Sequence, residues 1–64
     1  MTPEEIKQAR QSLGLTQSQL APLLGYSAAP RVAEIEAGKR NASDCVVRLL
    51  HAYLDGYRPS DWPE

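Results

Sequence analysis

The sequence contains one cysteine, one histidine and no phenylalanine, and its longest largely apolar stretch runs only from Leu20 to Tyr26. A lone Cys45 cannot form an intramolecular disulfide, and together with His51 it cannot complete a structural zinc site. A membrane span needs about 20 apolar residues, and a signal peptide needs an apolar core that the acidic amino terminus does not provide. We therefore expect a protein of the reducing cytoplasm, with no membrane partner, no metal and no other cofactor.

The chain has 64 residues, which allows one small domain and leaves no room for a second. A chain of this length buries only about 60% of the surface that its unfolded form exposes, so its hydrophobic core is thin. Catalysis requires a pocket that excludes water, which so small a domain does not offer. We expect a single domain over residues 1–64, no enzymatic activity, and either marginal stability as a monomer or support from a second copy.

The net charge is −1, from seven basic and eight acidic side chains. Nucleic-acid-binding domains are usually basic, so this sum argues mildly against such a partner. The charged residues are unevenly distributed along the chain, because acidic residues lie near both of its ends. Between them lie Arg31 and the segment Lys39-Arg40-Asn41. Charge alone therefore neither excludes DNA as a partner nor suggests it.

The apolar residues recur at helical spacing, and no stretch alternates as a β-strand would. Thr2 is a suitable N-cap for a first helix, because Glu5 follows three residues later in a capping-box arrangement. Gly14 is a suitable residue to end this helix. The inner face of this first helix is expected to be Ile6, Ala9, Arg10 and Leu13.

A second helix is expected between the cap Thr16 and Gly25, with an inner face of leucines. Pro22 lies within it and has no N–H to donate to the Ser18 carbonyl, so we expect a loosened or kinked first turn. The segment 27–29 is expected to be a connector, because a residue before a proline avoids the helical region.

A third helix is expected to begin at Pro30 and to end at Gly38, and a fourth to begin at Asn41 or Ser43 and to end at Gly56. The inward residues of the third helix are expected to be Val32, Ile35 and Glu36. The apolar stripe of the fourth helix is expected to be Val46, Val47, Leu49, Leu50, Tyr53 and Leu54. The sequence thus predicts an all-α fold, a small bundle of four to five short helices.

Two side chains of the fourth helix could carry chemistry, and both have simpler interpretations. We expect Cys45 to be a small core residue rather than a reactive thiol, and His51 to be exposed on the outer side. The segment 57–64 that follows is a proline-containing tail with two aromatic residues, Tyr57 and Trp62. This tail either folds back over the fourth helix or is buried by a second subunit.

The most specific pattern lies at about residues 16–38. Ala21 is a small residue at the point where two short helices would cross steeply, and Gly25 tolerates the positive φ of a tight turn. Val32 and Ile35 then point back into the core. In the order and spacing of these residues the chain resembles the lambda repressor/Cro (XRE-type) family of helix-turn-helix DNA-binding domains, which implies a lambda repressor-like fold.

The resemblance implies that the second helix lies across the DNA backbone and the third enters the major groove. The residues that would bond phosphates are Gln17, Ser18, Lys39, Arg40 and Asn41. The residues that would face the groove are Ser27, Ala28, Arg31 and Glu34. Arg31 would read guanine, because its guanidinium can pair with both major-groove acceptors; otherwise it is a surface charge paired with Glu34 or Asp44. Glu34 would accept from a cytosine amino group or repel misplaced phosphates.

Arg10 and Glu36 match the ion pair that the family forms between its first and third helices, and we assign them to structure. The chain also departs from the family pattern. The interval from Gly25 to Gly38 is one residue longer than is usual, and Pro30 replaces a small polar residue. Both departures leave the identity of the base-contacting positions open.

The expected function is that of a sequence-specific transcriptional regulator that binds an inverted-repeat operator in double-stranded DNA as a homodimer, without a small-molecule ligand. Its profile resembles small phage-type repressors and autorepressors, of the Cro-like or anti-CRISPR-associated kind, and also the DNA-binding antitoxins of toxin–antitoxin pairs. An alternative from another class is a protein-interaction module that has lost DNA binding. The near-neutral charge and the alanine-rich third helix favour that alternative.

Overall fold

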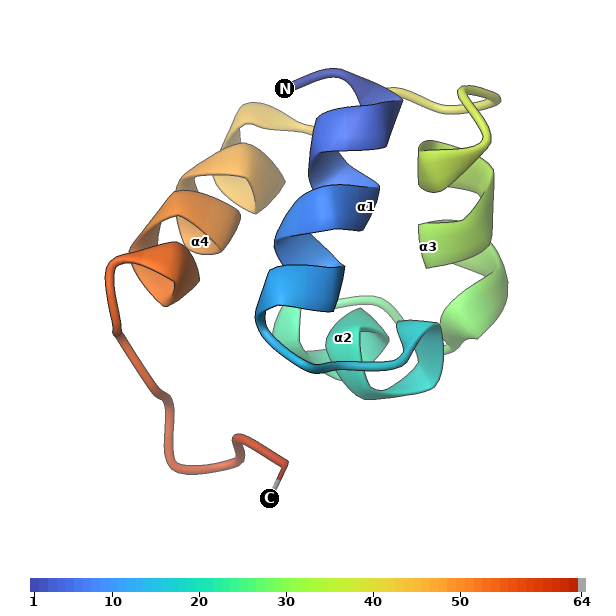
Figure 1. Cartoon of the computed structure of the whole chain (residues 1–64). Coiled ribbons are helices and arrows are strands. Elements are labelled where there is room, and N and C mark those ends of the chain that lie inside the picture. Colours follow the sequence, from blue (N-terminus) through green and yellow to red (C-terminus); the bar gives the residue numbers. More distant parts are fainter. Residues whose placement is uncertain (64) are drawn as a thin grey trace.

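The computed structural model describes residues 1–63, and within this range it contains four helices and no strand. The helices are α1 (Pro3–Ser12), α2 (Gln17–Leu23), α3 (Ala29–Glu36) and α4 (Asp44–Leu54). In Figure 1, α1 stands between α3 and α4, and α2 crosses the lower end of the molecule. No helix in residues 1–63 is long and apolar enough to cross a membrane. The prediction of a small all-α bundle is confirmed.

The helices begin where hydroxyl side chains cap them. Thr2 and Thr16 each close a capping box, and the Ser43 hydroxyl accepts the Val46 N–H at 3.3 Å. A cap of this kind stabilises a helix by about 1 kcal/mol, because it satisfies an N–H that has no partner within the helix. Helix α3 differs, since its N-cap is Ala28, which makes no side-chain hydrogen bond.

Two predictions about local structure are wrong. Ala29 is the first residue of α3 rather than part of a connector. Pro30 restricts Ala29 but does not exclude it from a first turn, where a proline ring meets no preceding helical carbonyl. The expected loosening at Pro22 is also absent from α2: the Leu20 N–H bonds to the Thr16 carbonyl at 3.0 Å, so the first turn is intact.

The core lies where the four helices meet, and three side chains at its centre are fully buried: Leu20, Val32 and Leu50. Each comes from a different helix, α2, α3 and α4, and α1 adds Ile6 beside them. Leu15, in the connector between α1 and α2, is also buried. Truncating a fully buried leucine to alanine typically costs about 2–5 kcal/mol, so this small cluster holds the helices together.

The buried face of α4 is narrower than the sequence predicted. Val46, Leu50 and Tyr53 are buried, whereas Leu54 is 43% exposed. Cys45 is exposed, so the prediction that it belongs to the core is wrong. Its position is one residue before Val46, and successive side chains of a helix point in different directions.

The tail after α4 packs against its own domain, as one of the two alternatives for its aromatic residues predicts. The Trp62 ring meets the Tyr53 ring edge-on, with centroids 5.2 Å apart. Arg58 joins them, because its guanidinium lies 4.2 Å from the centre of the Trp62 ring and its Nη1 donates to the Tyr53 carbonyl at 2.7 Å. Tyr57 stacks on Tyr53 at 6.0 Å and stays 55% exposed.

Tyr53 also connects α4 to the end of α2. Its hydroxyl donates to the Leu23 carbonyl at 2.7 Å, in a bond that is buried. Burial raises the pKa of Tyr53, which keeps this hydroxyl protonated and able to donate.

The variant Tyr53→Phe should lower the free energy of unfolding by about 1–3 kcal/mol, because it leaves the buried Leu23 carbonyl without this partner. Urea denaturation followed by circular dichroism measures the change. Tyr57→Phe is the matched control, since it removes the same group from an exposed ring and should change stability by less than about 0.5 kcal/mol. Equal effects of the two variants would show that the Tyr53 hydroxyl bond does not stabilise the fold.

Candidate functional site

The turn between α2 and α3 sets the direction of α3. Gly25 has φ +86°, in the left-handed region that side chains rarely adopt. The Tyr26 N–H bonds back to the Ala21 carbonyl at 2.9 Å, and Ala21 is fully buried. Because Val32 and Ile35 are buried on the inner side of α3, the opposite side of this helix faces solvent.

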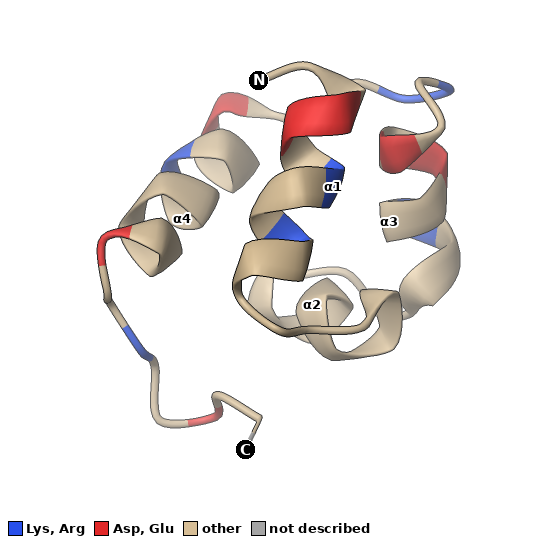
Figure 2. Ribbon diagram, in the orientation of Figure 1, with Lys and Arg blue, Asp and Glu red and all other residues tan. Residues whose placement is uncertain are grey.

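The exposed side of α3 and the loop after it hold most of the residues predicted to contact DNA. Arg31 lies on α3, and residues 39–41 follow the end of this helix. Figure 2 shows basic residues in blue on α3 and in the loop that follows it. The predicted contact residues that are exposed are Ser18, Ser27, Ala28, Arg31, Lys39, Arg40 and Asn41. Glu34 and Gln17 are partly buried.

Arg31, Glu34 and Arg40 form a cluster on this surface. Arg40 Nε donates to Glu34 Oε1 at 2.9 Å, and Arg31 Nε lies 3.5 Å from the same oxygen. The Arg31 side chain is 45% exposed, and its guanidinium lies 5.6 Å from the centre of the Tyr26 ring. Exposed ion pairs of this kind contribute about 0–1 kcal/mol, so both arginines can leave Glu34 for a stronger partner.

Tyr26 is a residue of this surface that the sequence analysis did not identify. Its ring supports the Arg31 guanidinium, an arrangement that orients the side chain without neutralising its charge. The signal in the sequence was an aromatic residue directly after Gly25, at the start of the turn. Sequence reasoning did not use it, because the pairing depends on how the turn between α2 and α3 folds.

Arg10 and Glu36 form an ion pair that joins α1 to the end of α3. Arg10 Nε donates to Glu36 Oε2 at 2.7 Å and Arg10 Nη2 donates to Oε1 at 3.2 Å. The third contact of the guanidinium is from Nη1 to the Leu15 carbonyl at 2.9 Å. The side chains of the pair are only 13% and 5% exposed.

The Gln17 side chain adds a hydrogen bond to this ion pair. Its Nε2 donates to Glu36 Oε1 at 3.1 Å, so its amide is held inside the domain rather than free at the surface. Burial by itself would raise the pKa of Glu36, but the hydrogen bonds from Arg10 and Gln17 and the Arg10 charge outweigh it and hold the pKa below its usual value.

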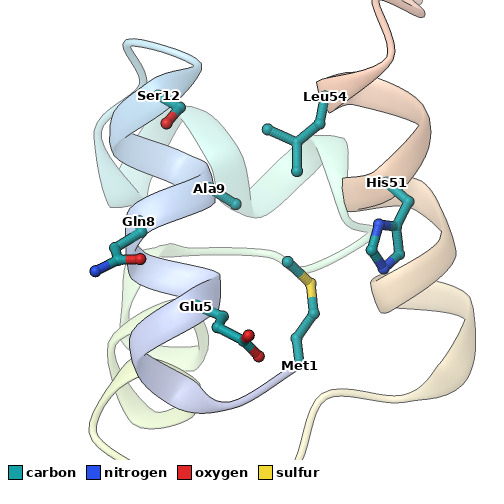
Figure 3. Close-up of a pocket in the computed structure, with 7 residues that line it drawn as sticks. All are labelled: Met1, Glu5, Gln8, Ala9, Ser12, His51 and Leu54. Carbon is teal, nitrogen blue, oxygen red and sulfur yellow. The ribbon is translucent and has the colours of Figure 1, made fainter.

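A hollow of about 480 Å³ lies between α1 and α4, away from α3 (Figure 3). It is lined by Met1, Glu5, Gln8, Ala9, Ser12, His51 and Leu54. His51 is exposed, as predicted, but it lines this hollow and does not lie on the outer side of α4. Within residues 1–63, no three His, Cys, Asp or Glu side chains are grouped so that they would hold a metal ion.

Comparison with protein families gives one result for this chain. A family model described as Helix-turn-helix matches residues 6–62. This span contains α2, α3 and α4 in full and most of α1. Searches of the curated proteins and of the solved structures gave no significant match.

The variant Glu36→Gln should lower the free energy of unfolding by about 3–5 kcal/mol near neutral pH, because it leaves the Arg10 charge nearly buried and unpaired. Thermal and urea unfolding measure the loss. Asp55→Asn is the control for removing an exposed carboxylate, with an expected change under about 0.5 kcal/mol.

The effect of Glu36→Gln should depend on pH. The pKa of Glu36 is lower in the folded state than its usual 4.5, so the ion pair contributes fully above that value and is lost as the pH falls through the folded pKa. The pKa of Glu5 is lowered too, chiefly by the hydrogen bond from the Thr2 backbone, but that contribution is common to wild type and variant. The difference between them should therefore shrink on acidification below about pH 4.5. A difference that stays constant with pH would contradict this assignment.

Proposed function

The chain belongs to the XRE-type (lambda repressor/Cro-like) helix-turn-helix family of DNA-binding transcription regulators, and we propose that it represses transcription by binding an inverted-repeat operator as a homodimer. The observation that carries the proposal is the exposed side of α3, where Arg31 projects beside the basic loop at residues 39–41. A bound dimer that covers a promoter would exclude polymerase without any further domain, as in a small phage-type repressor or autorepressor.

In this mechanism the first half of α3 enters the major groove. Arg31 pairs with the O6 and N7 acceptors of a guanine, a contact for which its guanidinium must be exposed. Ser27 and Ala28 lie at the start of the helix, where a thymine methyl would meet the Ala28 side chain. The extra residue between Gly25 and Gly38 would decide which of these residues reaches a base edge.

Phosphate contacts hold the domain in register. Lys39, Arg40 and Asn41 follow α3 and would meet the strand beside the groove. At the start of α2, Ser18 would donate from its hydroxyl and backbone N–H, since the first N–H groups of a helix have no partner within it. The Gln17 side-chain amide donates a hydrogen bond to Glu36 and so holds α2 to α3. Gln17 would therefore contact a phosphate through its backbone N–H and not through its side chain.

A protein-interaction module is the second candidate function. The net charge of −1 and the engagement of Arg31 and Arg40 by Glu34 favour it, because they reduce the positive potential of the α3 surface. The salt dependence of binding to duplex DNA distinguishes the two candidate functions. Affinity for duplex DNA that depends on several phosphate contacts should fall on the order of 10³-fold between about 50 and 200 mM salt.

The variants Arg31→Ala and Arg40→Ala should affect DNA binding differently. Arg31→Ala should cost about 1–3 kcal/mol and relax selectivity at one base pair. Arg40→Ala should weaken binding to all sequences similarly and reduce the slope of log affinity against log salt by about one. Selection of sites from random duplex DNA, followed by fluorescence anisotropy titrations, measures both effects.

Arg48→Ala is the matched control for these two variants, since Arg48 is an exposed arginine on α4. It should change affinity through net charge alone. If Arg31→Ala and Arg48→Ala had the same effect at every base position, base reading by Arg31 would be excluded. If the wild-type protein bound no duplex at low salt, the interaction module would be the better description.

The proposed homodimer forms through α4 and the tail. Trp62 packs on Tyr53 of its own domain, so the apolar surface left for a partner is that of Leu54 and Tyr57. Figure 1 places α4 on the opposite side of α1 from α3. Half-sites lie about 34 Å apart, so a dimer that binds them must keep its two α3 helices apart, and joining the copies on the α4 side does so because each α3 then lies on the far side of its own domain.

The variant Leu54→Lys should convert the dimer to a monomer and weaken operator binding by more than about tenfold, because one half-site then binds alone. Sedimentation at tens of micromolar measures the oligomeric state. The fold should persist in this variant, since Leu54 is 43% exposed and lies outside the buried core, and circular dichroism checks it. A wild-type protein that sediments as a monomer at this concentration, both free and on DNA, would rule out the dimer.

A further inference from the structure

The exposed surface of α3 carries a carboxylate among its arginines, which is unusual for a surface that must approach phosphates. Glu34 Oε1 lies 2.9 Å from Arg40 Nε and 3.5 Å from Arg31 Nε. Arg31 belongs to the part of α3 assigned to base reading, and Arg40 belongs to the loop assigned to phosphate binding. Glu34 therefore connects the two parts of the proposed DNA-binding surface through a single oxygen atom.

We propose that Glu34 is a specificity-determining residue, which competes with DNA for Arg31 and Arg40 and so weakens binding to wrong sequences more than binding to the operator. This inference rests on the DNA-binding function proposed above and adds a role for one residue of that surface. In the free protein the carboxylate occupies the two guanidinium groups as a phosphate or a base acceptor would.

On an unrelated sequence the competition disfavours binding. Phosphates must draw both arginines away from Glu34, which leaves an unpaired carboxylate facing the negatively charged backbone. Like charges placed together in this way act against wrong partners. The ion pairs are exposed, so the competition reduces affinity without preventing binding.

On the operator, contacts to the bases compensate for the loss of the ion pairs between Glu34 and the two arginines. Arg31 gains both acceptors of a guanine in place of one distant carboxylate oxygen. The Glu34 carboxylate, released from the arginines, can accept from the amino group of a cytosine in the groove. A DNA sequence with both the guanine and the cytosine gives Arg31 and Glu34 a partner each. A DNA sequence with neither base leaves the Glu34 carboxylate unpaired.

The two arginines depend on Glu34 to different degrees. Arg31 is also supported by the Tyr26 ring, 5.6 Å away, whereas Arg40 has a direct hydrogen bond to Glu34. Removing the carboxylate should therefore free Arg40 for any phosphate while Arg31 keeps its place over the ring. The added affinity comes from a phosphate contact, which does not depend on the DNA sequence. The ratio of the affinity for the operator to the affinity for unrelated DNA should therefore fall.

The test compares Glu34→Gln with Asp55→Asn, which makes the same charge change at the end of α4. Glu34→Gln should bind an unrelated duplex about tenfold more tightly at about 0.1 M salt and raise the salt slope by about one, which corresponds to one added phosphate contact. Its affinity for the selected operator should rise less, so the specificity ratio should fall by about fivefold or more. Asp55→Asn, shown by sedimentation to keep the wild-type oligomeric state, should shift both affinities by the same small factor.

Two further measurements make the outcome decisive. Glu34→Asp keeps the charge and should keep most of the specificity ratio. The side-chain Nε–H resonance of Arg40, observed by NMR in the free protein, should move toward its unbonded position in Glu34→Gln, because a neutral amide oxygen accepts more weakly than a carboxylate. Circular dichroism should show a native fold, because Glu34 is on the surface.

The proposal is overturned if Glu34→Gln changes both affinities by the factor seen for Asp55→Asn, or if it weakens binding to unrelated DNA. Either result would leave the DNA-binding function intact, provided that the wild-type protein selects an operator. A wild-type protein that binds no duplex at all would instead overturn the proposed function, and the role of Glu34 with it.

Discussion

Arg10 and Glu36 hold α3 against α1 through a bidentate ion pair that is almost excluded from water, and Gln17 adds the start of α2 to it. The hydrophobic core of so short a chain is thin, so apolar burial alone specifies the angles between helices weakly. A nearly buried charge pair specifies them more sharply, because its geometry must be good for the pair to repay its desolvation. The direction in which α3 presents its exposed side therefore depends on this interaction.

The exposed side of α3 and the loop after it present two arginines that already contact other side chains of the domain. Arg31 and Arg40 approach one oxygen of Glu34, and Tyr26 supports Arg31 from the other side. Because these contacts are exposed and weak, they arrange the guanidinium groups and still allow them to leave. A chain with a net charge of −1 can in this way present cations to DNA where they are needed, and the surplus acidic groups lie at other sites.

Capping chemistry explains why most of the helix starts could be predicted. Thr2, Thr16 and Ser43 bond to N–H groups three residues ahead, an interaction that depends only on neighbouring sequence. The wrong predictions concern longer-range effects. Cys45 and Leu54 were assigned to the core from their position on an apolar helix, but a helix end is buried only where another element covers it.

The sequence by itself determined the helices, the helix-turn-helix pattern with Ala21 and Gly25, and the residue types of the candidate surface, because these follow from local hydrogen bonding, periodicity and spacing. It also suggested the pairing of Arg10 with Glu36 through resemblance to a family. Only the tertiary structure decided which partners several side chains take: the Gln17 amide on Glu36, Arg40 on Glu34, and Trp62 on its own Tyr53. The sequence offered Glu34 as one partner of Arg31, because the two residues are three apart on one helix. The bonds of Gln17 and Arg40 and the packing of Trp62 depend on how α2, the loop after α3 and the tail are placed against the rest of the domain, which no local rule specifies.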